Sequence, residues 1–504
     1  MDFRKQSIIN AVMDNSYALD VQKFEYEWFK IENYTALSGI TLMLDVQSDS
    51  AIVVLNEFLG TKRQLVRGKG VSLHFPIEDC ENGDNALAYK GQILLRDIVF
   101  HQVHAVDESM AEATDDPLLR AAIFLLRAQI KHPKKSPFAG SCYAIFDYTN
   151  NIRRMSCWLW SDAPIVSAML RLAQSNLYPQ RNTDFIRLAT DIGETMLRHQ
   201  IANPKDEVCG AFTSRYRYYG NTERSFERLL GPNDTSYSIH WALLPLYEYT
   251  GDKRYLNAAR NGLLWVQKII HEMDFVPSHY YYEAKKWEDR AFVDTGFVVS
   301  GFEEYRRLTG SDEFDETILF CMERFIRQFR LPNGYYGQNY LPEYGADNRL
   351  FTRGHAWVLE GLNTCVRLFP EKFTEEAHSV AEKIAANQLA DGSFNYLWGY
   401  EEPQEHVKSG TGICEKATAI FAYLLQDLEK STMLPTNHLN TTAKKATDWC
   451  EKNMNSDVHS LGYGGIMAKS LSSGITGLPF LQVATGYANA YYIMAKLTQQ
   501  MGEK

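Results

Sequence analysis

The sequence has no apolar run long enough to cross a bilayer, and residues 1–20 lack the uninterrupted apolar core of a signal peptide. We therefore predict a cytoplasmic protein that does not enter a membrane. Of its 504 residues, 45% are hydrophobic and 23% are charged, which is typical of a globular chain. This length exceeds that of a usual single core, so we expect two domains or one large closed architecture.

Positive charge is also scarce. The chain has 52 Lys and Arg against 62 Asp and Glu, which gives a formal net charge of -10 at pH 7. A phosphate polymer or an anionic membrane would meet a repulsive field on average, which excludes nucleic acid and membrane surfaces as general partners. A small anion could still bind in a local basic pocket.

Metal-binding and cofactor-binding patterns are missing. No cluster of His, Cys and Glu has metal-ligand spacing, and no glycine-rich phosphate loop follows a strand. The cysteines are scattered without a Cys-x-x-Cys pair, which favours reduced thiols in the core over a disulfide framework or a zinc site. We therefore predict no metal and no cofactor. The cysteines are Cys80, Cys142, Cys157, Cys209, Cys321, Cys365, Cys414 and Cys450.

Two regions with different periodicity are present. Up to about residue 105, segments such as ITLMLDV and AIVVLNEF alternate in the strand period, which predicts a small β-rich, sandwich-like domain over residues 1–108. From residue 109 to 504, apolar residues recur at three and four, which predicts about twelve helices in six hairpins. We expect a mainly α fold whose hairpins form an (α/α)6 barrel. A bundle or an open solenoid is the alternative, although a solenoid would normally show cleaner repeats.

The hairpins echo one another. The segments LYEYTGDKRYLNAA (246–259) and YRRLTGSDEFDET (305–317) each end one helix, turn on Thr-Gly and start the next helix with acidic residues. Loops that combine glycine with an aromatic residue follow several second helices, at Cys209, Asn333 and Asp391. In a closed ring, one set of loops would surround a central mouth, and these aromatic residues would line part of it.

The stretch FTRGHAWVLEG (351–361) predicts an anion site at the start of a helix. Arg353 and Trp357 are four residues apart and share one helical face, with His355 beside them. Gly354 permits close approach of a ligand, and the helix N-terminus adds unpaired N–H groups and partial positive charge. The alternative is that Arg353 forms a structural salt bridge and Trp357 is ordinary core.

Two aspartates occupy matching points of consecutive hairpins, Asp234 in GPNDTSYSIHW and Asp294 in AFVDTGFVVSG. Both could be helix N-caps. In a ring they would instead converge on one mouth, where mutual repulsion would keep one protonated as a general acid. His240 lies near the start of the inner helix that follows Asp234, and it either contacts substrate or is a core histidine. The run HYYYEAKKW (279–287) is a sugar-stacking loop, a packed loop or an oligomer contact.

From about residue 150 the chain resembles the unsaturated glucuronyl hydrolases and the unsaturated rhamnogalacturonyl hydrolases. The matching motifs are Asp294-Thr-Gly-Phe with YRRLTGS after it, the box from Arg353 to Trp357 one hairpin later, and Ser409-Gly-Thr before a late inner helix. Asp234 precedes Asp294 by one hairpin, as the paired aspartates do in those families. The resemblance implies a barrel of six helical hairpins.

The resemblance also implies a reaction. An aspartic acid would protonate C4 of a terminal 4,5-unsaturated uronic acid, water would add at C5, and the resulting hemiketal would open and release the remaining oligosaccharide. Asp294 would be the acid and base and Asp234 its partner. Arg353, His355 and Trp357 would lie at the substrate subsite, with Arg353 binding the uronate carboxylate. His240, placed by its position after Asp234, is a further candidate for a substrate contact.

Other functions stay open at this point. The same barrel could hydrolyse saturated glucuronides. A sugar epimerase would need two or more convergent histidines, of which only His240 and His355 are candidates. A non-catalytic saccharide-binding protein would use the aspartates as caps alone. The sequence leaves the linkage, the leaving sugar, the sulfation preference and the formation of a homo-oligomer undetermined.

Overall fold

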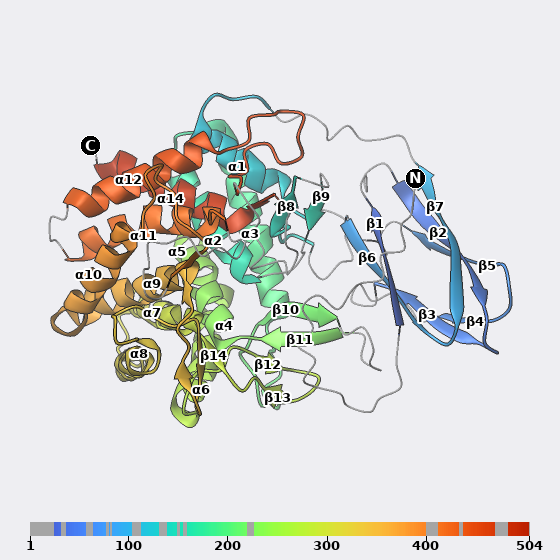
Figure 1. Cartoon of the computed structure of the whole chain (residues 1–504), viewed down its shortest axis with the longest axis horizontal. Helices are drawn as coiled ribbons and strands as arrows, with labels where there is room; N and C mark the ends of the chain where they lie inside the picture. The colour runs from blue at the N-terminus through green and yellow to red at the C-terminus, as the bar shows by residue number, and fades with distance from the viewer. Residues whose placement is uncertain are drawn as a thin grey trace.

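The computed structural model describes residues 25–31, 37–56, 64–76, 80, 83–102, 112–130, 139–148, 152–154, 159–218, 226–399, 412–432, 437–468 and 482–502. This part of the chain is mainly helical, with two antiparallel sheets near the N-terminus (Figure 1). No helix within these ranges is both long and apolar enough to cross a membrane.

The two N-terminal sheets have the strand orders β1-β6-β3-β4 and β5-β2-β7. Their inward side chains form one apolar core of their own, which includes Leu42 of β2, Val53 of β3 and Phe75 of β5. In β2, Ile40, Leu42 and Leu44 are fully buried at every second position, as the strand period predicts. The β-rich N-terminal region is therefore confirmed. The strands are β1 (Glu25–Ile31), β2 (Leu37–Val46), β3 (Ala51–Leu55), β4 (Gln64–Val66), β5 (Val71–Pro76), β6 (Gly83–Lys90) and β7 (Ile93–Gln102).

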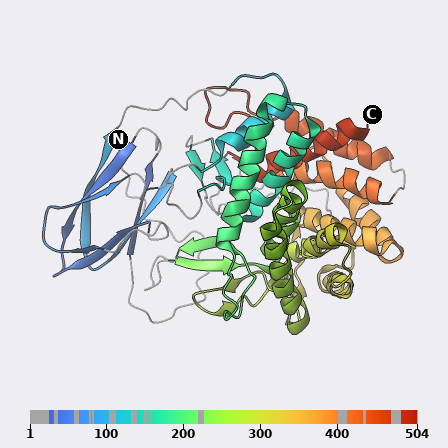
Figure 2. The same ribbon diagram turned by 180° about the vertical axis from the view of Figure 1, so that it is seen from behind.

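An inner layer of helices packs in a closed cycle. Element α2 packs against η5, η5 against α7, η6 and α7 against α9, α9 against α11, α11 against α14, and α14 again against α2. Figures 1 and 2 show the N-terminal strands beside this helical body in both views. The inner elements are α2 (Leu159–Ser175), α4 (Pro232–Ser238), η5 (Ile239–Leu243), α5 (Leu244–Thr250), η6 (Val293–Phe297), α7 (Ser300–Thr309), α9 (Thr352–Leu368), α11 (Glu415–Thr432) and α14 (Gly486–Gly502).

An outer layer covers the inner one. Some inner elements are buried on all sides: every residue of α4 is buried, and so is every residue of α9 from Thr352 to Val366. Outer helices such as α6 bury one stripe and expose the other, which produces the periodicity seen in the sequence. The outer helices are α1 (Pro117–Arg127), α3 (Asn182–His199), α6 (Lys253–Glu272), α8 (Asp315–Phe329), α10 (Pro370–Ala386) and α12 (Asn437–Lys452).

Short strands connect outer helices to inner ones, and strands of neighbouring hairpins pair with each other. Pairing between β19 and β8 joins the last of these loops to the first. The short elements are β8 (Ile145–Asp147), β9 (Ile152–Arg154), η4 (Pro179–Arg181), β10 (Thr213–Tyr218), β11 (Phe226–Leu230), β12 (Tyr280–Tyr281), β13 (Lys286–Trp287), β14 (Ala291–Phe292), β15 (Asn339–Leu341), β16 (Gly345–Ala346), β17 (Leu350–Phe351), β18 (Leu397–Trp398) and β19 (Val483–Thr485).

Glycines mark two recurring points of the hairpins. The Thr-Gly turns end helices as expected, because Gly251 and Gly310 adopt φ angles of 71° and 73° at the C-caps of α5 and α7. In the loops after outer helices, the glycine instead approaches the backbone of another outer helix. Gly210 contacts Asn261 of α6, and Gly464, after α12, contacts Arg120 of α1. This last contact closes the outer layer as well.

These two kinds of glycine differ in how they respond to alanine. Both Gly251 and Gly464 have positive φ, so alanine at either position costs roughly 1–2 kcal/mol of backbone strain. A Cβ at Gly251 would meet open space, whereas a Cβ at Gly464 would collide with the carbonyl of Arg120. We expect Gly464→Ala to lower the thermal unfolding midpoint clearly more than Gly251→Ala. Equal losses would contradict the close helix contact.

Candidate functional site

The functional candidates gather where the inner helices begin. Each of α4, η6, α9 and α14 starts one or two residues after a short strand. Asp234 lies in the first turn of α4, Asp294 is in the first turn of η6, and Arg353 follows the first residue of α9. Because η6 packs against both α4 and α9, the three side chains come to the same end of the helical layer. Ser409-Gly-Thr lies outside the described residues.

Neither aspartate occupies an N-cap position. The N-cap residues of α4 and η6 are Gly231 and Phe292, and neither helix start has a side-chain capping bond. Asp294 is half-buried, and its Oδ1 accepts a 2.6 Å hydrogen bond from the Asn233 amide. The neighbouring Asp234 is buried, and His279 Nε2 lies 3.8 Å from its Oδ2. Asn233 thus links the turn that carries Asp234 to Asp294.

The Arg353 guanidinium is buried against aromatic rings instead of a carboxylate. Its central carbon lies 4.9 Å from the Phe351 ring centre and 5.0 Å from that of Trp357. Its Nη1 donates a 2.5 Å hydrogen bond to the Tyr487 hydroxyl of α14, and its Nε has no partner. Among the described residues, no carboxylate oxygen lies within 4.0 Å of it. The structural salt bridge considered for Arg353 is not present there.

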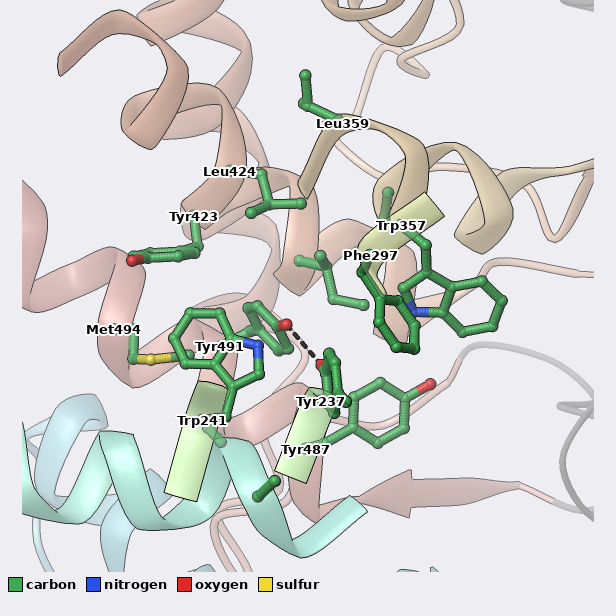
Figure 3. Packing of buried hydrophobic residues seen from close by; sticks show 14 of the residues in the cluster. Tyr237, Trp241, Phe297, Trp357, Leu359, Tyr423, Leu424, Tyr487, Tyr491 and Met494 are labelled. Atoms are coloured by element: carbon green, nitrogen blue, oxygen red, sulfur yellow. Dashed lines mark hydrogen bonds between the residues drawn. The ribbon is translucent and has the colours of Figure 1, made fainter. Parts of the chain in front are cut away.

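Trp357 connects this guanidinium to the Asp294 element. Its ring centre lies 5.9 Å from that of Phe297, which follows Asp294 by three residues, and 6.1 Å from that of Phe292. Figure 3 shows Trp357 and Phe297 side by side, near Tyr237 and Tyr487. Trp357 is 8% exposed, so it is largely a core residue that forms part of the wall beside Arg353.

His355 has both ring nitrogens bonded within the protein. Nδ1 bonds to the Phe351 carbonyl at 3.0 Å, and Nε2 accepts the Tyr336 N–H at 3.2 Å. Burial lowers the pKa of His355 to about 4, which keeps the ring neutral and suits this bonding. No ring nitrogen is left for a sugar, so His355 ties the loop before α9 to the helix.

His240 lies toward the opposite end of the inner layer. The charges that act on it are those of Glu304, Arg367, Asp427 and Arg171, in the later turns of α7, α9, α11 and α2. The aspartates and Arg353 belong to the first turns of their helices. Burial lowers the pKa of His240 to about 4. We therefore do not include His240 in the candidate site, although the sequence analysis had placed it among the substrate-binding residues.

A buried hydrogen-bond network lies between the inner helices below these residues. Glu360, two turns after Arg353, accepts a 2.7 Å hydrogen bond from Trp241 Nε1 and lies 3.2 Å from the Tyr491 hydroxyl. That hydroxyl is 2.6 Å from the Tyr237 hydroxyl (Figure 3). Tyr237 follows Asp234 by three residues. The network therefore joins three inner helices directly beneath the candidate site.

The aromatic residues of the 279–287 run pack within the protein. Tyr280 and Tyr282 donate 2.5 Å hydrogen bonds to Glu207 and Asp206, and Trp287 stacks on Trp265 of α6. The sugar-stacking role considered for these rings is therefore not seen in their geometry. What the run does bring to the site is His279.

Sequence reasoning missed Asn233, His279 and Tyr487. Asn233 directly precedes Asp234 in the sequence. Its hydrogen bond to Asp294 forms because the starts of α4 and η6 lie next to each other. His279 belongs to the run 279–287, in which only the aromatic residues predicted a function. Tyr487 had no sequence signal, because it is 134 positions from Arg353 and contacts it only when α14 packs among the other inner helices.

Comparison with known proteins gives a likeness in structure. No protein-family model matches the sequence, and no curated protein matches it. Among solved structures, unsaturated glucuronyl hydrolase from Bacillus sp. GL1 matches with a TM-score of 0.56 and 15% identity, over 77% of this chain and 96% of that one. The chain shares the fold of this enzyme. The resemblance indicated by the sequence motifs is thus confirmed for the fold.

Two further structures extend the comparison. An unsaturated glucuronyl hydrolase from Streptcoccus agalactiae matches with a TM-score of 0.56 and 12% identity, over 80% of this chain and 98% of that one. A family 76 glycoside hydrolase from a bovine Bacteroides thetaiotaomicron strain matches with a TM-score of 0.51 and 11% identity, over 96% of this chain and all of that one. A variant of the Streptcoccus agalactiae enzyme was solved in complex with dGlcA-GalNAc6S.

The Glu360 network yields a prediction about stability and pH. Burial raises the pKa of Glu360 from 4.5 to about 8, against the opposing effect of the Trp241 and Tyr491 hydrogen bonds. Between these values the folded chain holds a proton that the unfolded chain has released, so stability falls as pH rises. Gln cannot ionise and can keep both bonds. We expect Glu360→Gln to match wild type near pH 4.5 and to gain roughly 1.4 kcal/mol per pH unit above that, up to pH 8.

Chemical denaturation of both proteins at pH 5 and pH 8 measures this difference. Parallel pH dependence in the two proteins would show that Glu360 is ionised in the folded state and that the Glu360 network is not neutral.

Proposed function

We propose that the protein is a glycoside hydrolase that removes a terminal 4,5-unsaturated uronic acid from oligosaccharides by hydrating its vinyl ether. The observation that carries this proposal is the Arg353 guanidinium, which is buried in the first turn of α9 and has no carboxylate oxygen within 4.0 Å among the residues described. Asp234 and Asp294 lie in the first turns of neighbouring inner elements, at the same end of the helical layer. A buried cation without a counter-ion favours an anionic ligand, and a uronate carboxylate accepts hydrogen bonds from a guanidinium in the required planar geometry.

In the proposed reaction, Asp294 donates a proton to C4 of the unsaturated sugar. The positive charge that develops at C5 is met by water, which loses a proton to the Asp294 carboxylate as it adds, and the hemiketal formed then opens and releases the remaining saccharide. Asn233 orients the Asp294 carboxyl by donating to one oxygen. Asp234 is the charged partner, and Arg353 holds the carboxylate with Trp357 beside it.

The proposal extends to the architecture and the setting. We propose that residues 109–504 form a complete (α/α)6 barrel and that residues 1–108 form a separate β-rich domain. The closed cycles of inner and outer helices and the separate β core support this division. We further propose a cytoplasmic enzyme that needs neither metal nor cofactor, because the reaction requires only acid and base groups.

The alternatives predict different products. A hydrolase of saturated glucuronides would use the same carboxylates but would cleave the glycosidic bond itself. An epimerase is disfavoured, because His355 has both nitrogens bonded and His240 lies toward the other end of the helices. A screen of unsaturated and saturated uronyl disaccharides separates these functions, since only hydration abolishes the ultraviolet absorbance of the double bond.

Asp294 gives the first test of the chemistry. The amide oxygen of Asn can accept the same bond from Asn233, so Asp294→Asn should leave the fold and substrate binding intact. Without a proton donor, turnover should fall on the order of a hundred-fold or more. Continuous ultraviolet assay measures it. Activity within a few-fold of wild type would remove Asp294 from the mechanism.

Arg353 gives a test of substrate recognition. Lysine cannot reproduce the planar, bidentate contact with a carboxylate, so Arg353→Lys should raise the Michaelis constant for uronic substrates more than it lowers stability. A neutral analogue that carries a carboxamide should bind both proteins about equally. If the variant unfolds at a much lower temperature while its residual substrate affinity is unchanged, Arg353 serves the packing of α9 and α14 instead.

A further inference from the structure

A β-hairpin beside the candidate site carries a histidine to Asp234. Strands β12 and β13 pair Tyr280 with Trp287, which places His279 opposite Glu288 at the open end of the hairpin. The backbone confirms this register, because the Glu288 N–H donates to the His279 carbonyl at 2.9 Å. Two residues that are nine positions apart in sequence therefore face each other across the strands.

The side chains of this pair form a chain of charges that ends at Asp234. His279 Nδ1 lies 3.1 Å from Glu288 Oε2, and His279 Nε2 lies 3.8 Å from Asp234 Oδ2. Behind them, Arg290 Nε donates to the other Glu288 oxygen at 2.9 Å. Each imidazole nitrogen thus faces a carboxylate, and the ring can act as a donor toward both carboxylates at once only when both of its nitrogens carry a proton.

Burial separates this arrangement from an ordinary surface ion pair. The side chains of His279, Glu288 and Asp234 are 15%, 12% and 12% exposed, whereas that of Arg290 is 45% exposed. Burial would raise the pKa of Glu288, but its hydrogen bond with His279 and the charges of His279 and Arg290 outweigh burial and lower the pKa to about 2. Glu288 therefore carries a negative charge at neutral pH.

Asp234 depends on His279 more than on any other described cation. In the described ranges, no other cationic group lies within 4.0 Å of its carboxylate, and no side-chain or backbone donor forms a hydrogen bond to it. A 3.8 Å separation is too long for a hydrogen bond but short enough for an ion pair, and such contacts often tighten when substrate binds.

The hairpin itself is rigidly held. Tyr280 and Tyr282 bond to Glu207 and Asp206 of the preceding loop. Glu283, at the tip, accepts bonds from both the backbone and the side chain of Arg228, each at 2.6 Å. The two tyrosine bonds hold the strands next to His279, whereas the Glu283 pair holds the tip, at the other end of the hairpin from His279.

We propose that His279 and Glu288 are positioning residues for Asp234: Glu288 orients the imidazole, and the imidazole holds the Asp234 carboxylate in one orientation. This inference rests on the proposed function, because it assigns the two residues to the same reaction. The uronate is recognised elsewhere, at Arg353, so His279 affects turnover more than substrate affinity.

The test is a double-mutant cycle with unsaturated uronyl disaccharide as substrate. His279→Gln removes the imidazole but keeps a polar side chain, and we expect kcat to fall roughly ten- to hundred-fold while KM stays within about two-fold. Glu288→Gln should lower kcat less, because its amide oxygen still accepts from Nδ1. The double variant should be no slower than His279→Gln alone, since Glu288 acts through His279.

Glu283→Gln is the matched control, because it removes an ion pair from the same hairpin without facing Asp234, and its kcat should stay within about two-fold of wild type. Two results would overturn this inference while leaving the proposed function intact. The first is an active wild type with an unchanged kcat in His279→Gln. The second is a double variant in which the losses of the two single variants multiply. A wild type inactive on every uronic disaccharide would overturn the proposed function and this inference with it. If His279→Gln does not fold, a wild-type kcat in folded Glu288→Gln overturns the inference.

Discussion

The constraint on which this structure depends is the burial of its inner helices, which is complete along α4 and over Thr352–Val366 of α9. A helix that is surrounded on all sides must pair every polar side chain within the protein or with a ligand, because an unpaired buried group costs free energy. Along α9, the way in which buried polar side chains are paired differs between the first turn and Glu360. Glu360 is satisfied by Trp241 and by Tyr491, and it stays neutral. At the first turn, Arg353 keeps its charge and meets rings and one hydroxyl.

This gradient explains why the chemistry collects at one end. The first turns of α4, η6 and α9 carry Asp234, Asp294 and Arg353, and each of these elements begins one or two residues after a short strand. Below them, the hydrogen-bonded Tyr237 and Tyr491 hydroxyls and the contact between the Tyr237 and Phe297 rings hold the helix starts relative to each other. A charged sugar in such a site would meet groups that are already oriented, which lowers the reorganisation needed during reaction.

The sequence predicted the features that follow from local patterns. Helical periodicity, the Thr-Gly helix ends and the strand alternation of β2 are all found in the structure, because each depends on residues that are close in the chain. The shared face of Arg353 and Trp357 follows equally from helical spacing. Contacts that depend on how helices and loops pack could not be read in this way. Tyr487 reaches Arg353 from α14, and His279 reaches Asp234 only through a hairpin register. His355 shows the same limit, since its bonds to Phe351 and Tyr336 involve backbone groups.

The most direct measurement is a structure of the protein with a 4,5-unsaturated uronyl disaccharide bound to the Asp294→Asn variant. The account predicts the uronate carboxylate within hydrogen-bond distance of the Arg353 guanidinium, with C4 of the sugar facing position 294 and Asp234 beyond it. A sugar bound with its carboxylate away from Arg353, or bound at the other end of the inner helices near His240, would contradict it.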